Sequence, residues 1–141
     1  MGPTFPERFN LCEYFLDHNL AAGRGDKAAL VCGDDRRTYA QVAERARRVA
    51  AALRRAGLRP EERVLLVLPD GFEFAESWFG ALRAGGVFAM VNPLLKREQY
   101  DYYLEYTKAR VAVVHAEAMG EFGPAAEDAR LLETLLVVGG D

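Results

Sequence analysis

Four apolar runs in the second half of the sequence alternate with segments of helical pattern, and this alternation limits the possible folds most strongly. The runs cover residues 63–69, 87–91, 110–115 and 134–138, and the predicted helices cover 72–84, 96–107 and 117–130. None of the runs alternates apolar with polar residues, which is typical of strands buried on both faces of a parallel sheet. Strands separated by single helices predict a doubly wound α/β fold, with a mostly parallel sheet and helices on both faces.

A glycine pair, Gly85 and Gly86, joins the helix 72–84 to the strand 87–91. We expect Gly85 to form the left-handed turn that ends the helix, and Gly86 to let the chain re-enter the sheet closely. A helix-to-strand turn lies opposite the edge where such sheets bind ligands, and no GxGxxG or GxxxxGK[ST] motif follows a strand. The glycines are therefore predicted to be structural. The strand 87–91 is predicted to be central and to end at Asn92-Pro93.

Residues 1–37 are predicted to form a leading helix and a short hairpin, and residues 38–141 the α/β portion. Asn10 is the expected cap of the leading helix, whose apolar residues fall near one stripe: Leu11, Tyr14, Phe15 and Leu20. The hairpin covers residues 27–39. Thr38 and Gln41 have the spacing of a capping box that opens a long helix ending at Gly57. Asp70 is the expected cap of the helix that follows the strand 63–69.

Composition excludes several classes of function. The chain has 141 residues, half of them apolar, which suits one domain or part of a larger protein. A net charge of −3 disfavours nucleic acid as a partner, and no apolar run approaches the ~20 residues of a membrane helix. With no leader pattern at the start, a soluble cytoplasmic protein is expected. The isolated cysteines, Cys12 and Cys32, are predicted to be small core residues, and neither a disulfide nor a metal site is predicted.

The charged and aromatic side chains of the predicted helices suggest no catalytic group. The single serine, Ser77, lies inside a helix and not in a nucleophile elbow. Glu73 and Glu76 are expected on an exposed helix face, and the arginines around Glu44 on a solvated one. Tyrosines and a leucine of the helix 96–107 are expected to pack against the sheet: Tyr100, Tyr103 and Leu104.

The order of several motifs resembles the amino-terminal portion of the AMP-forming acyl- and aryl-CoA ligases of the adenylate-forming superfamily. The family shows a Thr/Ser-Tyr pair before a long helix, a G-L-x-x-x-x-R-V lead into a strand, and an AG-x-V…NP turn. They correspond here to Thr38-Tyr39, to residues 57–64, and to Ala84-Gly85, Val87 and Asn92-Pro93. The opening segment, with N-x-x-x-G-R-G-x-K at residues 19–27, is similar to the benzoate-CoA ligase branch. An aryl acid substrate is therefore favoured over a long-chain fatty acid.

The resemblance implies the amino-terminal part of the large domain of a multi-subdomain enzyme. Such ligases join a carboxylate to ATP, giving an acyl adenylate and pyrophosphate, and then pass the acyl group to the thiol of coenzyme A. The reaction uses ATP, Mg²⁺ and coenzyme A. The family places its phosphate loop, aryl pocket and catalytic lysine downstream of the region matched here, so the chain looks like a truncated piece whose partner is the remainder of its own polypeptide, and no catalytic residue is assigned.

The resemblance suggests one binding role, for two adjacent basic residues. Lys96 and Arg97 lie just past the carboxyl end of the strand 87–91, within reach of a coenzyme A phosphate. The alternative, favoured because lone surface cations usually need no such explanation, is that they are exposed charges opening a helix. The family often has leucine at the position of Tyr100 and small or basic residues around Leu94 and Leu95, which weighs against coenzyme A contacts from this loop.

Two other functions are consistent with the sequence. One is a fatty-acid or carrier-protein adenylating relative, and the other is a non-catalytic α/β module that binds a partner. For the isolated chain we expect no adenylation. We also expect self-association, because the final strand, residues 135–138, would present apolar surface and an unpaired edge.

Overall fold

The four apolar runs form one parallel sheet in the computed structural model, which describes residue 2 and residues 4–140. Its strands are β3 (Arg63–Val67), β4 (Val87–Met90), β5 (Val111–His115) and β6 (Thr134–Val138). Their order is β4-β3-β5-β6, and all three neighbouring pairs are parallel. The chain therefore adds β4 on one side of β3 and then crosses to the other side for β5. The predicted doubly wound α/β fold is confirmed.

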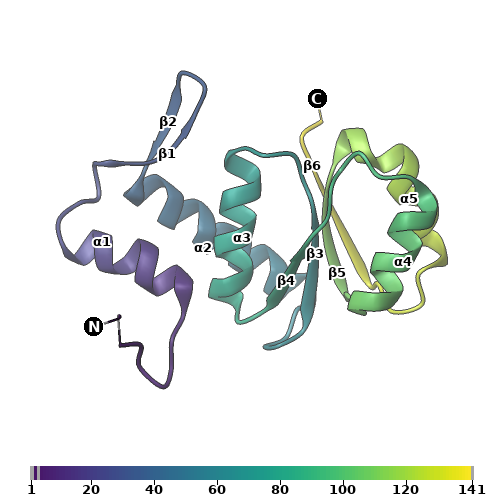
Figure 1. Ribbon diagram of the computed structural model, residues 1–141, viewed down its shortest axis with the longest axis horizontal. Helices are drawn as coiled ribbons and strands as arrows, with labels where there is room; N and C mark the ends of the chain where they lie inside the picture. Colours follow the sequence, from purple (N-terminus) through teal and green to yellow (C-terminus); the bar gives the residue numbers. More distant parts are fainter. Residues whose placement is uncertain (1, 3, 141) are drawn as a thin grey trace.

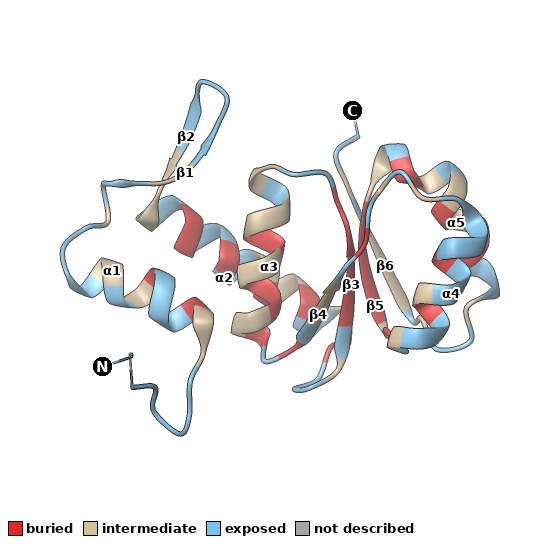
Figure 2. Cartoon of the chain, viewed as in Figure 1, coloured by how far each residue is buried: buried red, intermediate tan, exposed pale blue. Residues whose placement is uncertain are grey.

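Helices cover both faces of this sheet (Figure 1). On one face lie α2 (Tyr39–Arg55) and α3 (Phe72–Ala84), and on the other α4 (Arg97–Thr107) and α5 (Met119–Asp128), the last preceded by a short 3₁₀ turn, η2 (Ala116–Ala118). Alternate residues of the central strands enter two separate cores, so that Leu65 faces α4 and α5 while Val64 faces α3. Figure 2 shows burial concentrated on β3, β5 and the inward helix faces. A strand apolar on both sides fits only such a three-layer position.

The strand β4 lies at an edge of the described sheet, so the prediction of a central strand was wrong. Val87 is 51% exposed and Met90 55%, whereas every residue of β3 after Arg63 is buried. A run of four or five apolar residues predicts a strand, but it does not show whether one or two other strands pair with it. The glycine turn before it is as expected. Gly85 has φ +85°, and an added Cβ at Gly86 would lie 2.9 Å from Leu58 Cδ2.

The leading segment packs on α2 and α3 through a face that only partly matches the predicted stripe. It comprises η1 (Glu13–Asp17), which is a π-helical turn, and α1 (His18–Ala21). Cys12 and Leu16 are buried with the first half of α2, while Tyr14 and Phe15 are exposed and contact each other edge to face. The stripe was therefore wrong for Tyr14 and Phe15 and correct for Leu20, which continues the packed face of Cys12 and Leu16. Asn10 caps this helix as expected, accepting the Cys12 N–H at 2.8 Å.

A two-stranded hairpin projects from the body, as Figure 1 shows. It pairs β1 (Ala28–Cys32) with β2 (Asp35–Thr38) in antiparallel fashion. Cys32 is exposed at its far end, so the prediction that it belongs to the core was wrong; only the base of the hairpin contacts buried residues. The capping box that follows is confirmed. Gln41 N–H donates to Thr38 Oγ1 at 3.2 Å, and Thr38 N–H donates to Gln41 Oε1 at 2.9 Å.

The close contact between α2 and α3 depends on Gly80. A Cβ added at Gly80 would lie 2.4 Å from Val49 Cγ1 and 3.3 Å from the Ala46 carbonyl oxygen. We predict that Gly80→Ala lowers the free energy of unfolding by about 1–3 kcal/mol, because the two helices must separate to admit the methyl group. Urea unfolding followed by circular dichroism measures this change. The matched control is Gly120→Ala in α5, where nothing lies within 4 Å; equal losses in the two variants would contradict the packing argument.

Candidate functional site

The carboxyl ends of β3, β4 and β5 meet at one edge of the sheet, where parallel α/β folds bind ligands. We define the carboxyl edge as residues 68–71, 91–97 and 115–117, the segments that leave these three strands. Because the strand order reverses between β3 and β5, the switch point of the fold lies between residues 68–71 and 115–117. This edge is the candidate site that the fold defines.

The segment after β3 leads directly into α3. Gly71 is the N-cap of the helix, with an extended backbone, and no side chain caps it. The expectation that Asp70 caps α3 was wrong, because Asp70 lies one residue before the cap position from which a side chain reaches the first turn. The Asp70 side chain is therefore exposed at the edge and does not close the helix end.

The turn after β4 is held by two hydrogen bonds. Asn92 Oδ1 accepts the Leu94 N–H at 2.9 Å, and the Asn92 carbonyl accepts the Tyr100 hydroxyl at 3.1 Å. Tyr100 is fully buried and lies edge to face on Phe122, with ring centroids 5.2 Å apart, so burial raises the pKa of its phenol. The prediction that Tyr100, Tyr103 and Leu104 pack against the sheet is confirmed. The hydroxyl contact to Asn92, which the sequence did not predict, fixes the turn to α4.

Lys96 and Arg97 lie together at the start of α4, and both contact carboxylates. Lys96 Nζ is 2.8 Å from Glu121 Oε1, and the Arg97 N–H donates to Glu121 Oε2 at 3.1 Å. The Arg97 guanidinium pairs with Asp128 and lies 3.8 Å from Asp101 Oδ2. The hydrogen bond between Lys96 and Glu121 raises the pKa of the ammonium and lowers that of the carboxyl. An anion that binds here must therefore compete with the chain's own carboxylates.

The segment after β5 is organised by His115. Its Nδ1 accepts the Glu117 N–H at 3.3 Å, which caps the short η2 turn. Gly139, at the end of β6, lies against the imidazole, because an added Cβ there would be 2.3 Å from His115 Nε2. The contacts of this ring are thus structural ones.

A buried carboxyl lies one turn into α3. Glu76 is only 8% exposed, so the expectation of an exposed face was wrong for this residue; it shares its helix face with Phe72 and Gly80, four residues before and after. Burial raises the pKa of Glu76, an effect that Arg45 and Arg37 partly offset. Arg37 Nε lies 3.9 Å from Glu76 Oε1, and the Arg37 guanidinium lies over the Phe72 ring, 4.6 Å from its centroid.

The described residues contain no group of three or more His, Cys, Asp or Glu side chains that could hold a metal ion. Among the same residues, no helix is long and apolar enough to cross a membrane. Two cavities lie away from the carboxyl edge. The larger, of about 790 Å³, lies between the end of α4, α5 and the loop before β6, at the amino-terminal edge of the sheet. The smaller, of about 440 Å³, lies among the leading segment, α2 and α3.

The chain is thus a three-layer α/β protein whose carboxyl edge is the position at which folds of this class bind ligands. Residues 17–139 match the family described as AMP-binding enzyme, and the chain belongs to that family. It is 39% identical over 96% of its length to a benzoate–CoA ligase from Thauera aromatica, and 35% identical over 93% to a 4-hydroxybenzoate–CoA/benzoate–CoA ligase from Rhodopseudomonas palustris. It covers 26% and 24% of these proteins. The chain therefore spans about a quarter of the length of the curated relatives it matches.

Solved structures show the same likeness. An anthranilate CoA ligase in complex with anthranoyl-AMP matches with a TM-score of 0.88 and 33% identity, over 95% of this chain and 26% of that one. A benzoate CoA ligase from Burkholderia xenovorans matches with a TM-score of 0.83 and 35% identity, over 93% and 26%. The resemblance seen in the sequence motifs, and its benzoate-CoA ligase branch, are confirmed.

The buried Glu76 provides a test of the electrostatics beside this edge. Because the pKa of the Glu76 carboxyl is raised in the folded state, this carboxyl loses its proton at a lower pH in the unfolded chain than in the native chain. The free energy of unfolding therefore falls as pH rises, until the folded-state pKa is passed. We predict that Glu76→Gln becomes progressively more stable than the parent as pH rises above the ordinary carboxyl pKa of 4.5, with no such gain at lower pH. Urea unfolding across this range measures the difference.

Glu105→Gln, at an exposed position of α4 that is not among the groups shifting Glu76, serves as the control for removal of one carboxylate. A parent that gains stability relative to Glu76→Gln as pH rises would contradict the prediction. That result would mean that attraction from Arg37 and Arg45 outweighs desolvation of the carboxylate.

Proposed function

We propose that this chain is the amino-terminal part of the adenylating domain of an ATP-dependent, AMP-forming ligase for aryl acids of the benzoate type. In the first half-reaction a carboxylate oxygen attacks the α-phosphorus of ATP, giving an acyl adenylate and releasing pyrophosphate. In the second, the thiol of coenzyme A attacks the acyl carbon, giving a thioester and releasing AMP. The observation that carries the proposal is the 39% identity to a benzoate–CoA ligase across nearly the whole chain.

Within this proposal, residues 1–37 form the leading helix and hairpin, and residues 38–141 the α/β portion. The packing of Cys12 and Leu16 on Val42 and Ala46 supports treating both segments as parts of one domain. The remainder of the polypeptide is the principal partner of this domain, and the cytoplasm, where ATP and coenzyme A are available, is the proposed location.

The residues at the carboxyl edge do not fit Mg²⁺ or the phosphates of ATP. The described residues include no cluster of metal-ligating side chains, and the sequence has no glycine-rich loop with a lysine after a strand. In the proposed enzyme, both groups are therefore held by the remainder of the polypeptide. The role proposed for the chain is to supply the sheet and its carboxyl edge, on which the rest of the enzyme builds the site.

The proposal predicts a specific pattern of ATP–pyrophosphate exchange. The full-length polypeptide containing this chain should exchange labelled pyrophosphate into ATP with benzoate or a hydroxy- or aminobenzoate, and should then form the matching CoA thioester. Residues 1–141 alone are the control and should be inactive, since loss of a single positioned donor costs on the order of 10²- to 10³-fold in rate. Light scattering on the same control should detect self-association through exposed strand edges, including β6, where Val137 is half exposed.

Exchange that depends only on alkanoates would overturn the aryl assignment, and no exchange with any acid would favour a non-catalytic module. Fatty acyl relatives have less support here, because a fatty acyl CoA synthetase matches at only 24% identity and so shows the fold alone. The second candidate function is that of a carrier-protein adenylating relative, which adenylates its acid without using coenzyme A. It is favoured by 30% identity over 99 residues to a 2,3-dihydroxybenzoate-AMP ligase from Bacillus subtilis, and adenylation without thioester formation on coenzyme A would support it.

Within the same enzyme, we propose that Lys96 and Arg97 contact a phosphate of coenzyme A. Their position at the carboxyl edge supports this role. The phosphate would have to displace the carboxylates of Glu121 and Asp128, which now pair with them. Lys96→Ala and Arg97→Ala should each raise KM for coenzyme A about tenfold and leave pyrophosphate exchange unchanged, because a charge-assisted hydrogen bond is lost only in the second half-reaction. Arg55→Ala on α2 is the control. An unchanged KM in both variants would leave these residues as surface ion pairs.

A further inference from the structure

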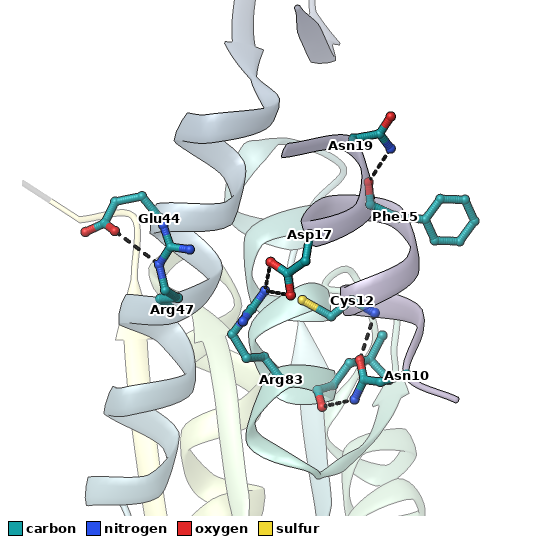
Figure 3. Close-up of polar contacts among 9 residues, drawn as sticks. Asn10, Cys12, Phe15, Asp17, Asn19, Glu44, Arg47 and Arg83 are labelled. Atoms are coloured by element: carbon teal, nitrogen blue, oxygen red, sulfur yellow. Dashed lines mark hydrogen bonds and ion pairs between the residues drawn. The ribbon is translucent and has the colours of Figure 1, made fainter. Parts of the chain in front are cut away.

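The smaller cavity is lined by three arginines from two helices. Arg47 and Arg54 come from α2 and Arg83 from the last turn of α3, while Asn10, Cys12 and Glu13 close the cavity from the start of the leading segment. Figure 3 shows Arg83 of α3 beside Cys12 and Asn10 of the leading segment, and Arg47 on α2 with its side chain turned toward Glu44. We call this space, of about 440 Å³, the arginine cavity.

Arg83 is held rigidly, with one donor unused. Its Nη2 donates to both Asp17 carboxylate oxygens, at 2.7 and 2.8 Å, and its Nε is buried without a hydrogen-bond partner. The pKa of the guanidinium is raised: burial, the largest single effect, would lower it, but the hydrogen bonds and charges of Asp17 and Cys12 together outweigh that cost. A buried N–H without a hydrogen-bond partner is costly.

The three guanidinium groups differ in their partners, and the carboxylates that pair with two of them lie outside the lining of the cavity. Arg47 lies 3.4 Å from Glu44, and Arg83 pairs with Asp17. Arg54 donates to the Arg83 carbonyl oxygen at 2.7 Å and, among residues 4–140, has no carboxylate within 4 Å. Glu13 is the one carboxylate that lines the space, against three guanidinium groups.

From these observations we propose that the arginine cavity binds a phosphoryl group, at a site separate from the carboxyl edge. Guanidinium groups present N–H donors in a fixed fork that matches phosphate oxygens, and donors from two helices can surround a tetrahedral anion. The guanidinium groups that line the cavity disfavour a cation, and their polarity disfavours an apolar ligand. The volume exceeds the roughly 30 Å³ of one water many times over, so the anion has room to bind with part of its hydration shell.

Binding here would join the leading segment to the body of the domain. The segment now contacts α3 through the Asp17–Arg83 pair and through Asn10 Nδ2, which donates to the Leu82 carbonyl at 2.9 Å. A phosphoryl group between Arg54, Arg83 and the first turn at residues 11–13 would add contacts to both sides. The inference does not depend on the proposed ligase activity, because the cavity lies away from the carboxyl edge.

The test is hydrogen exchange of the full-length protein, followed by mass spectrometry, with inorganic phosphate or pyrophosphate and with chloride at equal ionic strength. Local readout is needed because a ligase would bind the same anions at its catalytic site. We expect saturable slowing of exchange in peptides covering residues 10–17 and 47–56 with phosphate and not with chloride. Equal effects of chloride, or no slowing in these peptides, would overturn the proposal.

Substitutions test whether the slowing of exchange depends on the arginines of the cavity or on surface charge in general. Arg54→Ala should weaken this effect about tenfold in phosphate concentration, whereas the control Arg55→Ala, exposed on the same helix and outside the cavity lining, should leave it unchanged. Because Arg54→Ala also breaks a bond to α3, Glu13→Gln provides a second test. It removes the opposing carboxylate without touching that bond and should tighten binding severalfold. Equal affinities in Arg54→Ala and Arg55→Ala, or an unchanged affinity in Glu13→Gln, would overturn the proposal.

Discussion

Burial of β3 and β5 on both faces is the constraint on which the rest of the structure depends. Alternate residues of each strand enter different cores, so helices must cover both sides of the sheet. The parallel connections then place the start of α3 and the turns before α4 and after β5 at one edge. The location of the candidate site is thus a result of hydrophobic burial and chain connectivity, before any polar residue is considered.

Sequence pattern predicted most of this architecture because its signals are local. The helix α3 and the strand β6 lie where the apolar periodicity placed them, and the capping box at Thr38 and Gln41 gave the start of α2. The errors concern neighbours in space. Whether β4 lies at the centre or at an edge depends on strand order, and the burial of Glu76 depends on how the hairpin and α2 lie against α3. Neither can be read from a short window of residues.

The site was predicted less completely than the fold. Motifs identified the family, and position alone brought Lys96 and Arg97 to the carboxyl edge, but the carboxylates that face them come from α5, more than twenty residues away. The bond from Tyr100 to Asn92 likewise joins two residues that the sequence analysis interpreted separately, one as packing and one as a turn. Charges and hydrogen bonds of this kind depend on how α4 and α5 pack together. The arginine cavity was missed for the same reason, because its arginines come from two helices and its other wall from the leading segment.

The two cysteines have become chemically distinct through the packing of the leading segment and the projection of the hairpin. Cys12 is buried, and desolvation raises the pKa of its thiol despite the nearby Arg83, so it stays protonated and out of reach of reagents. Cys32 is exposed on β1 beside the two-residue turn of the hairpin. Of these two cysteines, a thiol-reactive fluorophore or spin label would therefore attach to Cys32 and not to Cys12, without mutagenesis. Attached there, it would report on how the hairpin moves relative to the body of the domain.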